Sequence, residues 1–285
     1  MVWSCLVSIL PGMAQTEKLT DYVNPFVGTD GYGNVYPGAQ IPFGGIQISP
    51  DTDSRFYDAA SGYKYNHLTL MGFSLTHLSG TGIPDLGDFL FIPGTGEMKL
   101  EPGTHEDPDQ GYRSRYSHDK EWASPNYYAV ELADYGVKAE MTSGVRSGMF
   151  RFTYPESDNA FIMIDMNHTL WQSCEWSNLR MINDSTITGY KLVKGWGPER
   201  HVYFTATFSK KLTGLRFVQD KKPVIYNTSR FRSSYEAWGK NLMACISFDT
   251  KAGEEVTVKT AISAVSTDGA RNNMKELDGL TFNEL

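Results

Sequence analysis

Short runs in which apolar and polar residues alternate dominate the second half of the chain. The segments His201–Ser209 (HVYFTATFS) and Glu255–Ser263 (EVTVKTAIS) alternate with a period of two and are rich in β-branched and aromatic residues, which is typical of half-buried β-strands. The segment Asn126–Thr142 divides at Asp134-Tyr135-Gly136 into two alternating runs, which predicts a β-hairpin. Further short strands are expected within Gly148–Pro155, Ala160–Met166 and Ser185–Val193.

The order of these runs predicts an all-β fold, a large antiparallel β-sandwich. Turn dipeptides such as Asn-Pro, Ser-Gly and Asp-Gly separate many short strands, as in sandwiches of two packed sheets. Between Pro25 and Gly103 glycine and proline are concentrated and strand patterns are few, so we expect a loop-rich N-terminal region. Ser266–Leu277 (STDGARNNMKEL) predicts a short C-terminal helix, with Ser266, Thr267 or Asp268 as the N-cap.

The composition fits a globular domain and argues against one class of partner. The 285 residues are 40% apolar and 21% charged, which is enough apolar material for a core. The net charge is −7 and no basic block occurs, so nucleic acid is not an expected partner. No repeat or low-complexity linker divides the chain, and residues 20–266 are expected to form one β-sandwich domain.

The first residues resemble the second half of a secretory signal peptide. An apolar run over Val2–Leu10 precedes Gly12-Met13-Ala14, a pattern that favours cleavage after Ala14. We interpret residues 1–14 as a partial signal peptide and expect an exported protein, periplasmic or extracellular. The run is much shorter than the roughly 20 apolar residues of a membrane-spanning helix, so no transmembrane segment is expected.

Two cysteines, Cys174 and Cys245, follow this leader. Export permits a disulfide between them, and two buried free thiols fit the sequence equally well. No CxxC pair occurs, which argues against a zinc ribbon and against a thioredoxin-like site.

The segment His77–Phe89 (HLSGTGIPDLGDF) concentrates groups that carry chemistry. A zinc site needs ligands at closer spacing than His67 and His77, and the Asp85–Asp88 pair is a weak element alone. Ser79 follows His77 by two residues without the G-x-S-x-G turn of a nucleophilic serine. Hydroxyls that bond to their own backbone in a turn are the better interpretation.

Two other kinds of site find little support in the spacing. The loop Gly28–Ala39 (GTDGYGNVYPGA) lacks the Gly-Lys-Ser/Thr ending of a phosphate-binding loop. A glycosidase needs two carboxylic acids about 5 to 10 Å apart. Nothing local singles out such a pair among Glu131, Asp134, Glu140 and Glu175.

Taken together, several longer blocks resemble glycoside hydrolase family 92, specifically its amino-terminal half. The blocks are Asp21–Thr52, Ser61–Tyr65 (SGYKY), Gly72–Pro93 (GFSLTHLSGTGIPDLGDFLFIP) and Ile262–Leu277 (ISAVSTDGARNNMKEL). Weaker similarity lies in Ala139–Pro155 and Arg200–Lys210. The resemblance extends from Asp21 to the end of the chain.

The resemblance implies an exported, mostly bacterial, calcium-dependent and inverting exo-α-mannosidase that acts on mannose-containing glycans. It also implies a supersandwich-like amino-terminal β-sandwich joined to a carboxy-terminal (α/α)6 barrel. In the family, the acid, the base and most calcium ligands belong to the barrel. We therefore expect residues 267–285 to begin the linker to that barrel, no catalytic or metal-binding residue in this chain, and no hydrolysis by the chain alone.

The resemblance also assigns the candidate substrate-binding residues. They lie within the block Gly72–Pro93, in and next to the turn Ser79–Asp85: His77, Ser79, Gly80, Thr81, Gly82, Ile83, Pro84 and Asp85. Some relatives place at the position of Ile83 an aromatic residue that contacts the leaving-group sugar, and isoleucine offers no ring to stack. For His77, the alternative is a structural histidine bonded to a backbone carbonyl.

Other polar and aromatic residues remain candidates for the same interface. The Gly28–Ala39 loop offers Asp30, Tyr32, Asn34 and Tyr36. Trp171, Trp176 and Trp196 are expected in or beside loops, as sugar platforms or, more in keeping with composition, as core or interface residues. The alternative function is a non-catalytic carbohydrate-binding or structural module.

Overall fold

The structure is a computed structural model that describes residues 18–54, 59–224 and 235–285. Residues 1–17, 55–58 and 225–234 lie outside this description, and with them the predicted signal peptide over residues 1–14. In the described ranges no helix has the length and apolar character needed to cross a bilayer.

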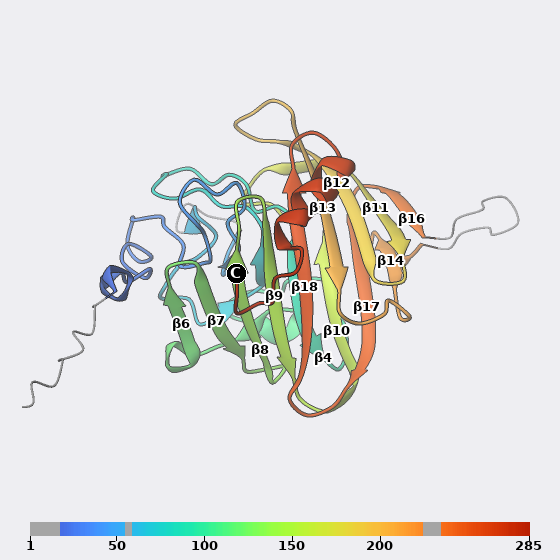
Figure 1. Ribbon diagram of the computed structural model, residues 1–285, viewed down its shortest axis with the longest axis horizontal. Coiled ribbons are helices and arrows are strands. Elements are labelled where there is room, and N and C mark those ends of the chain that lie inside the picture. Colours follow the sequence, from blue (N-terminus) through green and yellow to red (C-terminus); the bar gives the residue numbers. More distant parts are fainter. Residues whose placement is uncertain (1–17, 55–58, 225–234) are drawn as a thin grey trace, which may run out of the picture.

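Two antiparallel sheets stack face to face and confirm the predicted β-sandwich (Figure 1). The larger sheet has nine strands in the order β16 (Glu236–Gly239), β11 (Ser173–Asn183), β12 (Thr186–Lys194), β13 (Arg200–Phe208), β18 (Glu254–Ser263), β9 (Ser147–Tyr154), β8 (Val137–Ser143), β7 (Tyr127–Leu132) and β6 (Glu121–Ser124). The smaller sheet has seven, in the order β1 (Ser49–Asp51), β3 (Gly72–Ser74), β4 (Leu90–Thr95), β10 (Ser157–Asp165), β17 (Leu242–Thr250), β14 (Arg216–Gln219) and β15 (Lys222–Pro223).

The alternating runs form strands close to their expected bounds. The segments predicted over 201–209 and 255–263 are β13 and β18, which pair with each other in register from Tyr203↔Ser263 to Phe208↔Val258. The predicted hairpin is β7 and β8, joined at Ala133–Gly136, where Gly136 has a φ of 63° and donates to Leu132. Alternation located these strands because one face of the larger sheet is apolar and the other polar.

Several strands carry no alternation because both faces of the smaller sheet are buried. One face meets the larger sheet, and the other is covered by a second apolar cluster that includes Met71, Ile92, Tyr112, Phe161 and Met243. Strands β4 and β17 are accordingly buried at successive positions rather than at alternate ones. Alternation alone therefore does not reveal them.

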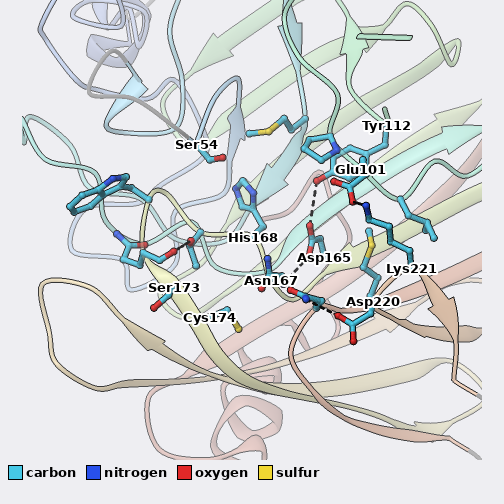
Figure 2. A pocket seen from close by; sticks show the side chains of 18 residues that line it. Ser54, Glu101, Tyr112, Asp165, Asn167, His168, Ser173, Cys174, Asp220 and Lys221 are labelled. Carbon is cyan, nitrogen blue, oxygen red and sulfur yellow. Dashed lines mark hydrogen bonds and ion pairs between the residues drawn. The ribbon is translucent and has the colours of Figure 1, made fainter. Parts of the chain in front are cut away.

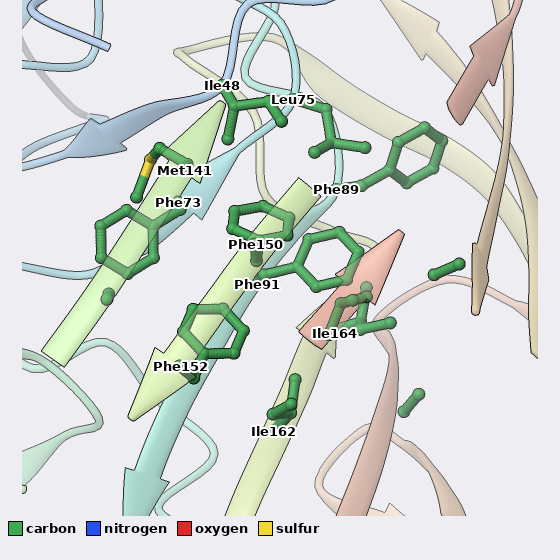
Figure 3. Packing of buried hydrophobic residues seen from close by; sticks show 14 of the residues in the cluster. Ile48, Phe73, Leu75, Phe89, Phe91, Met141, Phe150, Phe152, Ile162 and Ile164 are labelled. Atoms are coloured by element: carbon green, nitrogen blue, oxygen red, sulfur yellow. The ribbon is translucent and has the colours of Figure 1, made fainter. Parts of the chain in front are cut away.

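The main core fills the space between the sheets with aromatic and branched side chains (Figure 3). Phe91 of the smaller sheet packs against Phe150 of the larger one with ring centroids 4.9 Å apart. Phe150 also stacks on Phe152 at 5.3 Å and meets Phe73 at 6.4 Å. All four rings are fully buried, so this cluster holds the two sheets together through close-packed apolar contact.

The loop-rich N-terminal region is confirmed and is attached along one edge of the sandwich. It contains β1, β3, the two-stranded ribbon of β2 (Thr69–Leu70) and β5 (Ser114–Arg115), and 3-10 helices at Leu19–Tyr22, Pro108–Gln110 and His118–Lys120. At the edge strand β6, buried Glu121 accepts hydrogen bonds from Tyr63 at 2.9 Å and Tyr128 at 2.5 Å. This carboxylate joins the N-terminal loops to the larger sheet.

The C-terminal helix is also confirmed. Helix α1 spans Thr267–Met274 and continues as a 3-10 turn over Lys275–Leu277. Ser266 is the N-cap, since its Oγ accepts from the backbone amide of Gly269 at 2.9 Å. Figure 1 shows the helix against the outer face of the larger sheet, in front of β12, β13 and β18. Cys174 and Cys245 are buried free thiols, which decides between the two alternatives for them.

Truncation of Phe150 tests this description of the core. We expect Phe150→Ala to lower the free energy of unfolding by about 3–5 kcal/mol, because it removes a fully buried ring and leaves a cavity between the sheets. Denaturant unfolding followed by circular dichroism measures the change. Phe43→Ala is the control: the Phe43 side chain is fully exposed, so its loss should change stability by less than about 0.5 kcal/mol.

Candidate functional site

The candidate residues lie on one loop that leaves β3 and returns to β4. Its two ends meet at a neck formed by Thr76 and Asp88. The Thr76 hydroxyl donates to Asp88 Oδ2 at 2.7 Å, and the amide of Asp88 donates to Thr76 Oγ1 at 3.0 Å. The amide of Gly87 donates to the Thr76 carbonyl at 2.8 Å. These three bonds close residues 77–87 into a compact loop, here called the 77–87 loop.

His77 anchors the first end of the 77–87 loop inside the protein. Its Nε2 lies 2.8 Å from Asp51 Oδ1, and its Nδ1 lies 2.8 Å from the Gln47 carbonyl oxygen. The other carboxylate oxygen of Asp51 lies 2.8 Å from Nε2 of His168. Both ring nitrogens of His77 are thus engaged and its side chain is fully buried, which favours the structural alternative for this residue.

Asp51 is a buried carboxylate held between two imidazoles. Burial alone would raise its pKa, but the charge and hydrogen bonds of His77 and His168 lower the pKa of Asp51 well below its usual range. Gly62 closes over it with a φ of 90°, and a side chain at that position would collide with Asp51 Oδ1. The Ser61–Tyr65 block therefore needs its glycine because of this close approach.

Asp88 anchors the second end through a buried ion triad. Lys191 Nζ lies 3.1 Å from Asp88 Oδ1, and Arg200 Nη1 donates to Asp88 Oδ2 at 2.5 Å. Burial opposes ionisation here too, yet the two cations lower the pKa of Asp88 well below its usual range. Lys191 is itself fully buried and also donates to the His168 carbonyl at 2.6 Å. This last bond joins the triad to the Asp51 network.

The tip of the 77–87 loop faces solvent. Ser79, Gly80 and Gly82 are exposed, Thr81, Ile83 and Asp85 are half-buried, and Pro84 is buried. Gly80 has a φ of 75° and donates to the Asn34 carbonyl at 2.7 Å, while Thr81 donates to the Ile83 carbonyl at 3.0 Å. Asp85 caps the amide of Leu86 at 2.7 Å. Ser79 is thus the exposed residue of the tip with a side-chain hydroxyl, and Ile83 is partly accessible beside it.

The Gly28–Ala39 loop packs beside it, as expected for two parts of one surface. In addition to the Asn34 contact, the Tyr36 ring lies 5.0 Å from the imidazole of His77. The carboxylate of Asp30 accepts a hydrogen bond from the backbone amide of Gly31. Tyr32 is 90% exposed. Tyr32 is therefore the member of this loop that presents an aromatic face to solvent.

A cavity of about 840 Å³ lies next to the segment that contacts the 77–87 loop, and Figure 2 shows the side chains that line it. Gln172 lines it and donates to the Pro84 carbonyl at 3.0 Å, which ties its wall to the loop. Polar walls come from residues far apart in sequence, among them Glu101, Tyr112, Asp165 and Asn167. Within it Tyr112 donates to Asp165 at 3.3 Å. The size suits a saccharide of one or a few units.

Trp171 stands at this cavity with an unusual backbone. Its side chain is 59% exposed and its φ is 83°, a region that bulky residues rarely adopt. The strain is held because Leu170 on one side donates to the Leu86 carbonyl at 2.9 Å and Gln172 on the other bonds Pro84. Strained residues of this kind concentrate at binding sites. Trp176 and Trp196 are also exposed, at 46% and 66%, so none of the three lies in the core.

Sequence reasoning did not find Asp51, His168, Lys191 or Arg200 as partners of the loop. Asp51 and His168 are 117 residues apart and Asp88 and Arg200 are 112 apart, and no local spacing marks such pairs. The one signal in the sequence for the cavity wall was Trp171, which was expected in or beside a loop.

The carboxylates considered as a catalytic pair are all engaged in ion pairs. Glu140 is bonded by Arg151, Tyr127 and Lys138, which against the effect of burial lower its pKa to about 2. Asp134 pairs with Arg115, Glu131 with Lys120, and Glu175 with Lys240. Among residues 18–54, 59–224 and 235–285, no group of three or more His, Cys, Asp or Glu side chains is arranged to hold a metal ion.

Fold and site together define a β-sandwich domain that presents a rigid glycine-containing loop beside a polar, tryptophan-rimmed cavity. The model of the glycosyl hydrolase family 92 N-terminal domain matches residues 22–263. The chain therefore belongs to glycosyl hydrolase family 92, and the matched part is the family's N-terminal domain.

Individual relatives agree with this assignment. The solved structure of the GH92 family glycosyl hydrolase CcMan5 superposes with a TM-score of 0.78 at 26% identity, covering 93% of this chain and 35% of that one. The GH92 inverting mannosidase BT2199 from Bacteroides thetaiotaomicron shares the fold, with a TM-score of 0.75 at 24% identity over 94% of this chain and 35% of that one.

A curated relative from Arthroderma benhamiae bears the name "Uncharacterized secreted glycosidase". It is 30% identical over 139 residues, which are 48% of this chain and 17% of that protein. The chain thus spans about a third or less of the length of the relatives it matches.

Removing the charge of Asp88 tests the anchor of the loop. We expect Asp88→Asn to lower the free energy of unfolding at pH 7 by about 3–5 kcal/mol, because fully buried Lys191 and partly buried Arg200 lose their anionic partner. The pKa of Asp88 is lowered on folding, so its stabilisation is present above the unfolded pKa of about 3.9 and is lost as pH falls below it.

The difference between wild type and Asp88→Asn should therefore be largest above about pH 5 and shrink in acid, measured by denaturant unfolding across pH. The exposed pair Asp109–Arg115 supplies the control: Asp109→Asn should change stability much less. Equal effects of the two substitutions, or a difference independent of pH, would contradict the assignment.

Proposed function

We propose that this chain is the sandwich domain of an exported, calcium-dependent, inverting exo-α-mannosidase, and that its 77–87 loop helps to bind a mannose-containing glycan. The observation that carries the proposal is the exposed loop tip, held by two buried aspartate networks and placed beside the Trp171 cavity. Membership in family 92 and the secreted relative support the substrate class and the export.

The chemistry of the loop suits a sugar. Ser79 offers a hydroxyl that donates and accepts, and exposed Gly80 and Gly82 leave backbone groups accessible to a ligand. Ile83 gives an apolar contact but no ring. Trp171, on the cavity side of the loop, supplies an aromatic face that can stack on the C–H face of a pyranose. In this chain the tryptophan would take the place of a ring at position 83.

The domain would contribute positioning rather than acid or base. An inverting glycosidase uses one acid and one base about 6.5–9.5 Å apart, with a water between the base and the sugar. Asp51 and Asp88, the buried carboxylates nearest the loop, each already have two partners: His77 and His168 bond to Asp51, and Lys191 and Arg200 to Asp88. They cannot serve as the pair, so we assign acid and base to a C-terminal (α/α)6 barrel, with residues 267–285 leading toward it.

Calcium dependence belongs to the same proposal, but the described residues do not fit a calcium site. Calcium takes six to eight oxygen ligands. The carboxylates around the 77–87 loop are already engaged with cations or backbone amides. The ion would have to be held by residues of the barrel, and the role we assign to this chain does not depend on it.

A non-catalytic carbohydrate-binding module is the second candidate. It is favoured by the same loop and cavity, because both can bind a sugar without turnover. The two proposals share the binding surface and differ in whether the chain acts together with a catalytic barrel.

Trp171→Ala tests the binding surface directly. We expect the purified chain to bind an α-linked mannotriose and the variant to bind it at least about tenfold more weakly, since an exposed stacking ring is lost. Isothermal titration calorimetry measures both. Trp122→Ala, which removes a 45% exposed tryptophan on the distant edge strand β6, is the matched control and should bind as wild type does.

Hydrolysis of an α-mannoside should be absent from the same preparation. Chelator-sensitive turnover by these 285 residues alone would overturn the assignment of acid, base and calcium to another domain. Unchanged affinity in Trp171→Ala would remove the cavity from the binding surface.

A further inference from the structure

The outer face of the larger sheet carries a second recess, of about 640 Å³, at the end formed by β16, β11, β12 and β13. One row of side chains crosses all four strands at the same level. Trp238 pairs with Asn178, Asn178 with Tyr190, and Tyr190 with Tyr203 in the strand register. Residues paired in this way point to the same side of a sheet. The neighbours Leu179, Ile187 and Phe204 point into the core, so this row faces outward.

The aromatic members of the row are held in place and accessible. Trp238 is 54% exposed at the edge of the sheet. The ring of Tyr190 lies 4.9 Å from that of Tyr203, and its hydroxyl lies 3.1 Å from Nδ1 of His201. Trp238 and, beyond Asn178, the half-buried rings of Tyr190 and Tyr203 make an aromatic strip that is interrupted by one amide side chain. This strip gives a ligand an aromatic surface on which to stack.

Polar groups border this strip on both sides. Arg180 and Glu236 pair across β11 and β16 one step along the sheet, and Asn178 donates to the Ala237 carbonyl at 3.0 Å. Arg271 and Asp268 of helix α1 form an ion pair with each other on the opposite wall. Two arginines and two acids leave the recess without net charge, which argues against a phosphate-rich or otherwise anionic ligand.

We propose that this recess, here called the sheet-face groove, binds a pyranose unit of a neutral oligosaccharide. Trp238 would stack on the C–H face of the ring. Exposed Arg180 and half-buried Glu236 line the recess beside Trp238 and can bond to the hydroxyl groups of the sugar. An apolar surface with a few fixed polar groups is the arrangement of small-molecule sites. The choice of mannose as the sugar rests on the proposed function, but the groove itself does not.

Nitrogen-15 NMR of the tryptophan indoles tests the groove and the loop surface in one titration. The whole chain is labelled, and the indole signals of Trp238, Trp171 and Trp122 are assigned from the single alanine variants. We expect α-linked mannotriose, titrated to about 10 mM, to shift the Trp238 signal saturably. Trp122 lies at the opposite edge of the same sheet with similar exposure, 45% against 54%, and its signal should not move.

Two substitutions connect the shift to the groove without removing its core contacts. Arg180→Gln and Glu236→Gln should each raise the dissociation constant measured at the Trp238 signal by about fivefold. The dissociation constant measured at the Trp171 signal should stay unchanged. Circular dichroism checks that both variants are folded.

A Trp238 signal that stays fixed in the wild type, or a dissociation constant read from Trp238 that is the same in the wild type and in both variants, overturns the sheet-face groove. If Trp171 responds while Trp238 does not, the groove fails and the proposed function stands. The reverse result keeps the groove and removes the loop surface.

Discussion

Two buried carboxylates and the side chains that bond to them hold both ends of the 77–87 loop. Asp51 lies between His77 and His168, and Asp88 lies between Lys191 and Arg200. A buried charge without a partner is costly, so each network has a narrow choice of geometry. Because one network grips the start of the 77–87 loop and the other its end, the sandwich fixes both ends of a loop that has almost no secondary structure of its own.

This arrangement would let a glycine-containing loop act in the proposed glycan binding without first being ordered by the ligand. Its tip is open to solvent, while the neck at Thr76 and Asp88 is fully hydrogen-bonded and Pro84 is tied to the cavity wall through Gln172. A preformed loop loses little conformational freedom when a ligand binds. A sugar-binding role for the loop therefore needs no rearrangement, and it leaves the chemical step to groups outside the described residues.

Alternation predicted strands where one sheet face is polar, whereas in the doubly buried smaller sheet the sequence predicted β10, within Ala160–Met166, but not β4 or β17. The strands β7, β8, β13 and β18 alternate clearly, whereas β4 and β17 do not, because a second apolar cluster covers them. The helix over 267–274 was predictable from its cap. For the candidate site, the resemblance pointed to the loop, but the residues that anchor it, His168, Lys191 and Arg200, come from strands and turns about a hundred residues away. Only the folded sheet order brings them together, and no local pattern encodes that.

Amide hydrogen exchange of the intact chain tests most directly whether the aspartate networks preform the loop. The amides of Gly87 and Asp88 donate inside the neck, and they should exchange as slowly as core amides of β10. In Asp51→Asn, which weakens the link to both histidines, the two amides should exchange at least about tenfold faster while those of the β7–β8 hairpin keep their protection. Fast exchange at Gly87 and Asp88 in the wild type, or no change in the variant, would contradict the account.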